Sequence, residues 1–406
     1  MTYALRLRLP PFATRSPSSP AGSMSPAMTA PSDPEAAPQT RASRPARDPR
    51  LDFFRGVGML IILVAHIPND RWALWIPARF GFSDATEMFV FLSGMASAIA
   101  FGATFDRHGA TALIARVVQR IWQIYWAHVI VFIAVVALVT VAGTTPDGVS
   151  YLGRLNLIPF VEDPARLLVG LLTLTYVPNY FDILPMYIVI LALLPVMVFA
   201  ERVHRALPFA LMAVLWAAAQ FGYASLPAEP WSDRAWFLNP FGWQLLFFTG
   251  FFIMRGTVPT PGRSRRVLAL AILCVVATVP FAWYVLLNAQ PLLRSAAAAL
   301  APLTDKTDFG ALRLVHFLAL AYIAVYVVGE RGERLKGLAV RVISVVGQQS
   351  LAVFVTSMVL AQAIGIALDA TGRSVLLEAL GNLAGFAVVI GTAYLVRGFK
   401  AMPWKA

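Results

Sequence analysis

Residues 51–69 read LDFFRGVGMLIILVAHIPN, an apolar segment with charged residues near its start and a histidine near its end. At about 100° per residue, the eleven steps from Arg55 to His66 come within about 20° of three full helical turns, so both side chains share one face about 16 Å apart. Asp52 lies three residues before Arg55 and joins that face. Ionisable side chains on a membrane helix are costly toward lipid. We therefore expect this stripe to face a polar cavity or the interior of a helix bundle.

The composition of the whole chain is that of a membrane protein. Of 406 residues, 58% are hydrophobic and 13% are charged, with a mean hydropathy of +0.69, whereas soluble domains have about 45–50% apolar and about 25% charged residues. About twenty apolar residues suffice for one membrane helix. Apolar segments follow one another at residues 53–69, 85–104, 117–142, 183–200, 206–224, 238–254, 266–288, 312–329, 344–367 and 379–399. The sequence thus predicts an all-α fold, a polytopic membrane bundle of about ten transmembrane helices.

Basic residues between these segments predict the orientation. With the amino terminus inside, the inside loops and the chain ends next to them hold 20 Lys and Arg residues and the outside loops hold 9. Lys and Arg accumulate on the cytoplasmic side, so both termini are predicted to be cytoplasmic. The net charge of +12 does not predict a nucleic-acid partner, because such a site needs one contiguous cationic surface.

Three regions are predicted along the chain. Residues 1–50 contain ten of the 28 prolines and no long apolar stretch, which indicates a disordered cytoplasmic tail. Residues 51–400 form the transmembrane domain, and residues 401–406 a short cytoplasmic tail. The single cysteine, Cys274, excludes an intramolecular disulfide.

His66 is the first candidate catalytic residue. Imidazole titrates near neutrality, so His66 could act as general base toward a hydroxyl arriving from the outer side. Arg55, near the inner end, could hold an anionic group with its planar, always charged guanidinium. The alternative is that Arg55 pairs with Asp52 as an interface anchor and that His66 only caps the helix.

Two carboxylates lie at the start of the second apolar segment, at the same outer level as His66. Asp84 and Glu87 are three residues apart, and one of them could orient the imidazole as a carboxylate does in hydrolase triads. Alternatively, Asp84 is the N-cap of this helix and Glu87 favours its first turn. Ser93 lies on the far side of the helix, where Gly94 is expected to allow close helix packing.

Further polar residues are candidates for substrate binding. Asp182 and Tyr180, in an outer loop, belong to a mixture of hydroxyl, amide and aromatic groups that suits a sugar, although aromatic residues also form the interface belt of any membrane protein. Asn239, Gln244 and His316 are polar positions within the apolar segments. The sequence has no CxxC pair, HExxH motif or glycine-rich phosphate loop, so neither a metal site nor a permanently bound cofactor is predicted.

The quoted motifs resemble a known family. The Arg55-x10-His66 spacing and the FVFLSG stretch that ends at Gly94 resemble the membrane acyltransferase-3 superfamily. Within it, the chain looks like a member of the OpgC family over about residues 48–400. This resemblance is carried by LDFFRG (51–56), GFSDA (81–85), DILPMYIV (182–189) and NPFGWQLL (239–246).

The resemblance implies an acyl-CoA dependent O-succinyltransferase of the bacterial inner membrane. It would move a succinyl group from cytosolic succinyl-CoA to hydroxyls of osmoregulated periplasmic glucans. His66 matches the catalytic histidine of the superfamily and Arg55 its essential arginine, while Asp84 and Glu87 match a family segment. One departure is VGQQS at 346–350, which runs on to Ser357 without the second histidine that many superfamily members carry.

Other functions are compatible with these residues. A transporter or flippase for a glycan or lipid could use Arg55, Asp52 and Glu87 as substrate or ion sites, and a scaffold for glucan-synthesising proteins would need none of them. An O-acetyltransferase of another cell-surface polysaccharide would share the same chemistry, since only the family resemblance separates succinyl from acetyl. The sequence leaves open the oligomeric state, and also whether transfer is direct or passes through an acylated His66.

Overall fold

The computed structural model describes residues 48–402, and within this range the protein is helical. The described residues contain two isolated β-bridges and no strand, which confirms the predicted all-α class. The predicted tail of residues 1–50 lies outside the described residues up to residue 47. Its last two residues, Pro49 and Arg50, instead form the first turn of helix α1, because Asp48 caps that helix by accepting a hydrogen bond from the Arg50 backbone nitrogen. Residues 403–406 of the predicted carboxyl-terminal tail are also outside the described range.

The helices follow one another with short connections. In chain order they are α1 (Pro49–His66), η1 (Arg71–Trp75), η2 (Pro77–Arg79), α2 (Ala85–Ser97), the π-helix η3 (Ala98–Gly102), α3 (Ala103–Ala142), α4 (Tyr151–Arg154), α5 (Ile158–Glu162), α6 (Pro164–Thr173), α7 (Ile183–Val203), α8 (Leu207–Gln220), α9 (Pro240–Arg255), α10 (Arg265–Ala282), α11 (Tyr284–Ala289), α12 (Pro291–Thr304), α13 (Ala311–Val328), α14 (Leu338–Gln348), α15 (Ser350–Thr371) and α16 (Val375–Lys400).

Six helices of the described chain are long and apolar enough to cross a membrane, as expected for a multi-pass membrane protein. One is the continuous run α2–η3–α3, and the others are α7, α10, α13, α15 and α16. The remaining predicted segments also form helices, but α8 has 14 residues, α9 has 16, and α1 contains three charged residues. Six spans are therefore supported, and the number ten stays a prediction.

Two predicted segments are interrupted. The predicted helix 344–367 breaks at Gln349 into α14 and α15, and the predicted helix 266–288 breaks at Trp283 into α10 and α11. The first break falls at the polar triplet QQS (348–350), whereas hydropathy gives no sign of the second. The chain also forms the shorter helices α6 and α12.

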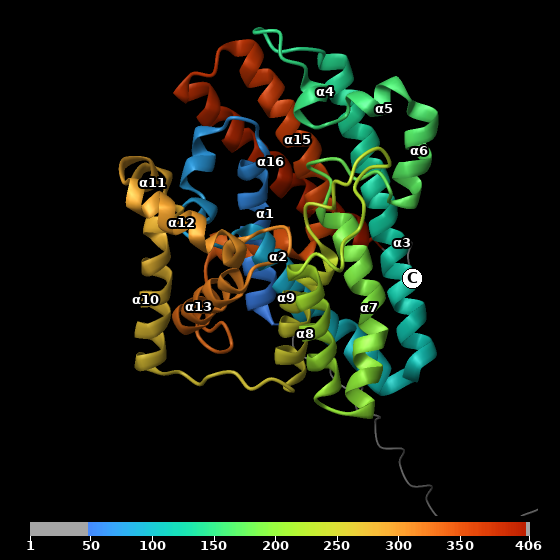
Figure 1. Ribbon diagram of the computed structural model, residues 1–406, viewed down its shortest axis with the longest axis vertical. Helices are drawn as coiled ribbons and strands as arrows, with labels where there is room; N and C mark the ends of the chain where they lie inside the picture. The colour runs from blue at the N-terminus through green and yellow to red at the C-terminus, as the bar shows by residue number, and fades with distance from the viewer. Residues whose placement is uncertain (1–47, 403–406) are drawn as a thin grey trace, which may run out of the picture. The chain divides into compact units, whose positions relative to one another are not determined.

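The helix α1 lies in the interior of the bundle, where it packs against α2, α14, α15 and α16. Figure 1 shows α10 to α13 on one side of α1 and α2, and α3 to α7 on the other. We name the two ends of the bundle after α1: the His66 end, where α1 finishes, and the Asp52 end, where it begins. The short helices η1 and η2 connect α1 to α2 at the His66 end.

Glycines set the distance between α2 and α9. A Cβ atom at Gly94 would collide with the carbonyl oxygen of Phe247, and one at Gly250 would collide with that of Phe91. The two backbones therefore touch at both positions, as small residues allow in membrane bundles. This confirms the packing role expected for Gly94 and holds α2 firmly in place.

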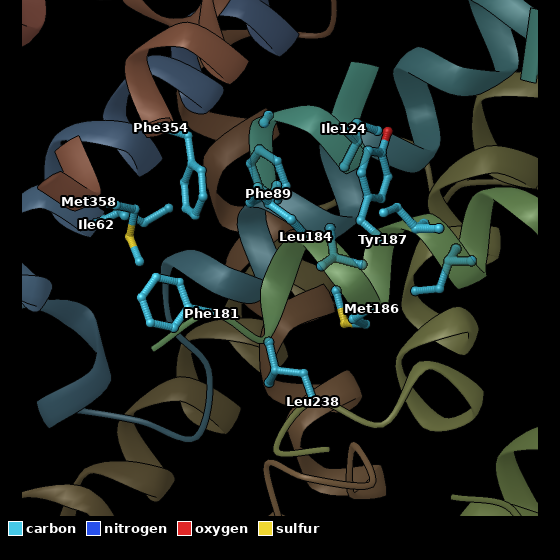
Figure 2. Packing of buried hydrophobic residues seen from close by; sticks show 14 of the residues in the cluster. Ile62, Phe89, Ile124, Phe181, Leu184, Met186, Tyr187, Leu238, Phe354 and Met358 are labelled. Carbon is cyan, nitrogen blue, oxygen red and sulfur yellow. The ribbon is translucent and has the colours of Figure 1, made fainter. Parts of the chain in front are cut away.

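Apolar side chains fill the space between α1, α2, α7 and α15. Figure 2 shows Ile62 of α1 beside Met358 of α15, with Phe181, which precedes α7, and Phe354 near them. All four side chains belong to the main buried cluster. Close-packed apolar side chains therefore contact α1 one turn before its His66 end.

Candidate functional site

His66 is the last residue of α1 and is held by two contacts. Its Nδ1 lies 2.7 Å from the carbonyl oxygen of Ile62, one turn earlier. Its ring meets the ring of Tyr180 edge to face, with 5.2 Å between the ring centroids. The residue is half-buried, and these two contacts fix the orientation of the imidazole.

The Ile62 contact decides which nitrogen of His66 carries the proton. A carbonyl oxygen only accepts hydrogen bonds, so Nδ1 must be the donor. In the neutral ring the lone pair is then on Nε2, which is the form a general base requires. The carbonyl of Ile62 therefore holds Nδ1 of His66, and an orienting role of Asp84 or Glu87 toward the imidazole stays a prediction.

The two carboxylates instead fix the start of α2. Asp84 accepts a hydrogen bond from the Thr86 backbone nitrogen at 2.6 Å, and Glu87 accepts one from the Asp84 backbone nitrogen at 2.7 Å. Together they form a capping box, which satisfies amide groups that the first turn of a helix leaves unpaired. The N-cap alternative for Asp84 is therefore confirmed.

Each carboxylate also pairs with a cation from the segment around α12 and α13. Lys306 Nζ lies 2.5 Å from Asp84 Oδ2, and Arg313 Nη2 lies 2.5 Å from Glu87 Oε1. Burial by itself would raise the pKa of Asp84, but the ammonium of Lys306 outweighs it and holds that pKa well below its usual value. Asp84 is therefore an ionised structural group at neutral pH.

His316 lies beside this pair of ion pairs and is 2% exposed. Its Nδ1 is 2.7 Å from the Ser83 hydroxyl, and its other ring edge rests against the backbone at Gly81, where a Cβ atom would collide with Nε2. The structure therefore places His316 in the contact between α13 and the start of α2. Its Nε2 has no hydrogen-bond partner among the described residues, and substrate binding by His316 stays a prediction.

Tyr180 and Asp182 lie between His66 and α7. Tyr180 has a positive φ of 86°, a strained conformation for a residue with a side chain, and its hydroxyl donates to the carbonyl oxygen of Met358 at 2.5 Å. Asp182 accepts from the Phe237 backbone nitrogen at 3.3 Å. Burial raises the pKa of Asp182 to about 6. Tyr180 therefore shapes the wall beside His66, and Asp182 is a buried carboxyl group that titrates near neutrality.

Asp52 and Arg55 face different neighbours at the other end of α1. Gln348 of α14 donates to Asp52 at 3.2 Å, and Arg55 donates to the carbonyl oxygen of Leu92 in α2 at 3.0 Å. Asp52 is 4% exposed, and a Cβ atom at Gly347 would collide with its carbonyl oxygen. Both side chains thus point into the bundle, as the spacing predicted.

Asn239 and Gln244 have structural roles. Asn239 caps α9 through the Phe241 backbone nitrogen and donates to Asp308 at 2.8 Å. Gln244 is fully buried and donates to the carbonyl oxygen of Met212 at 2.9 Å. The expectation that these two residues bind substrate finds no support, because their amide nitrogens are bonded within the scaffold.

The cations Lys306 and Arg313 were missed as site residues. The available signal was their position: both lie in or next to a loop that the sequence predicts on the outer side, where basic residues are fewer. Within the described residues, His, Cys, Asp and Glu side chains do not gather into groups of three that could hold a metal ion.

Buried charged and polar side chains form a polar site at one end of the bundle. The long apolar helices define a multi-pass, all-helical membrane protein. Comparison with protein families identifies which one: residues 47–401 match the family described as OpgC protein, and the chain belongs to that family. No curated protein and no solved structure matches the chain.

Proposed function

We propose that this protein is an acyltransferase that moves a succinyl group from cytosolic succinyl-CoA to hydroxyl groups of periplasmic glucans across the bacterial inner membrane. The observation that carries the proposal is the imidazole of His66, whose Nδ1 donates to Ile62 and whose Nε2 therefore holds the lone pair. Membership in the OpgC family supports a transferase of this kind. Multi-pass architecture suits a reaction whose donor and acceptor are on opposite sides of a membrane.

In the proposed reaction the hydroxyl oxygen of the glucan attacks the thioester carbon, and Nε2 of His66 takes the hydroxyl proton. The tetrahedral intermediate then expels the CoA thiolate, which recovers this proton from His66. In this proposal the ammonium of Lys306, which pairs with Asp84 at the start of α2, would favour the oxyanion that forms. The sum is one ester formed, one thioester broken and no net change in protons.

Arg55 is the group we assign to the donor. It lies toward the Asp52 end of the same helix, 11 residues before His66, and its guanidinium already hydrogen-bonds a backbone carbonyl of α2. A guanidinium is always charged and suits the phosphates of CoA. The donor would then extend along α1 with its thioester at His66.

The test is CoA release by the purified full-length protein in lipid nanodiscs, supplied with succinyl-CoA and glucan oligosaccharides. His66→Ala should lower the rate at least about 100-fold, the lower limit for loss of a general base. His204→Ala is the matched control, because His204 is an exposed histidine in the turn after α7. Equal rates for wild type and His66→Ala would exclude His66 as the base.

A cellular experiment separates the transferase from a transporter. Periplasmic glucans from cells lacking this protein, complemented with wild type or His66→Ala, should carry the mass increments of a succinyl ester only with wild type. Unchanged substitution together with an altered amount or location of glucan would favour transport instead.

A further inference from the structure

A cavity of about 440 Å³ opens at the His66 end, between η1 and the first turn of α16. Trp72 and Trp75 of η1 line it together with Arg71 and with Glu378 of α16. Val64 and Val375 complete the apolar part of its wall. The volume is in the range of small-molecule sites, which combine apolar walls with a few convergent polar groups.

The polar part of the wall can both donate and accept hydrogen bonds. Arg71 Nη1 lies 3.7 Å from Glu378 Oε2, and the side chains are 54% and 3% exposed. Hydroxyl groups of a ligand would match a guanidinium donor beside a carboxylate acceptor, since each hydroxyl is both a donor and an acceptor.

The aromatic part of the wall is unusually exposed. Trp75 has 74% of its surface accessible, although its ring contacts that of Phe80 with 6.3 Å between centroids. Trp72 is held from α16 by Phe386, again at 6.3 Å. An indole combines a flat apolar face with one polar edge, so it can cover the C–H face of a sugar ring.

We propose that this cavity binds one sugar unit of the acceptor glucan, while a unit further along the same glucan chain presents its hydroxyl to His66. This inference rests on the proposed function and names where the acceptor is held. Arg71 is five residues after His66, so their Cα atoms are at most about 18 Å apart. Val64, which lines the cavity, lies about 200° around α1 from His66. The cavity therefore contributes only to ligands several sugar units long.

Charge gives no advantage to the obvious rival occupant, a phospholipid headgroup. The charged side chains that line the cavity are Arg71 and Glu378, which lie 3.7 Å apart. Their charges cancel, so an anionic phosphate would meet no net positive charge, and the buried Glu378 carboxylate would repel it at short range. A neutral sugar has no such penalty.

The first experiment compares acceptors of different length in the full-length protein. The ratio of kcat/KM for a long glucose oligomer to that for a disaccharide should fall about tenfold in Trp75→Ala, as expected when about 1.4 kcal/mol of stacking is lost. Arg71→Gln should lower the same ratio. Trp122→Ala is the matched control, because Trp122 is 61% exposed on α3 and should keep the wild-type ratio. An unchanged ratio in both Trp75→Ala and Arg71→Gln would overturn the proposal.

A binding experiment makes the site testable apart from the reaction. His66→Ala protein should bind the long oligomer with a Kd that rises about tenfold when Trp75→Ala is added. This result would support the site even if no succinyl transfer were found. If Trp75→Ala instead removed co-purifying phospholipid and left oligomer binding unchanged, the cavity would be a lipid site and the proposal would be wrong.

Discussion

Replacing Arg313 with methionine should destabilise the contact between α13 and α2 by about 3–5 kcal/mol, the usual cost of removing one partner of a buried ion pair. Arg313 Nη2 and Nε lie 2.5 Å and 2.7 Å from Glu87 Oε1. The Glu87 side chain is fully buried, and that of Arg313 is 9% exposed. Each hydrogen bond to a charged group contributes about 1.5–3 kcal/mol, so two lost bonds give the same range. Methionine retains an apolar stem, which confines the change mainly to the charge.

The assay is thermal unfolding of the protein in detergent. The quantity measured at each temperature is the fraction of protein that remains monodisperse. Arg313→Met and Glu87→Gln should each lower the apparent midpoint, and the double variant should recover much of the loss, because no uncompensated charge is left buried. Arg202→Met is the control: the side chains of Arg202 and its partner Asp106 are 62% and 44% exposed, so its effect should stay below about 1 kcal/mol. The reasoning is refuted if Arg313→Met unfolds with the wild type, or if the double variant is no better than the worse single one.

Three further predictions concern other parts of the molecule. Because burial raises the pKa of Asp182 from 3.8 to about 6, folding takes up a proton between these values. Thermal midpoints of the wild type relative to Asp182→Asn should therefore fall as pH rises from about 4 to about 6, by the equivalent of about 3 kcal/mol, and the difference should be constant below about pH 3. Gly94→Leu should separate α2 from α9, since a Cβ there collides with the carbonyl oxygen of Phe247, and should lower the midpoint and the yield. Gly391→Leu, with open space around it, should leave both unchanged. Arg55→Leu should raise the KM for succinyl-CoA at least about tenfold, the equivalent of one charge-assisted hydrogen bond, as measured by CoA release.

Structural features that depend only on residues close together in the sequence were predictable. The capping box at the start of α2 is readable from Asp84 and Glu87 three positions apart, because both partners belong to one helical turn. The inward orientation of Asp52 and Arg55 followed from the cost of charges facing lipid. The hydrogen bond from His66 to Ile62 also joins residues one turn apart, yet we expected a carboxylate in its place because the triad analogy favoured one.

Features that depend on distant residues were not predictable. Asp84 pairs with Lys306, Glu87 with Arg313 and Ser83 with His316, across more than 200 residues of chain. Nothing local in the sequence marks these partners. The helix α14 ends at Gln348, within the polar triplet QQS, but such a triplet alone does not separate a helix break from a polar stretch inside a helix.

The sequence by itself determined the class of the protein, the places of most of its long helices and which of them carry charged side chains, because hydropathy and helical periodicity act over one or two turns. Only the tertiary structure decided that Asp84 pairs with Lys306 and Glu87 with Arg313. It also brought Trp72 and Trp75 together with Glu378 around one cavity. Long-range pairing of this kind depends on which helices pack together, and that is settled by the total packing and electrostatic energy of the bundle rather than by any one segment.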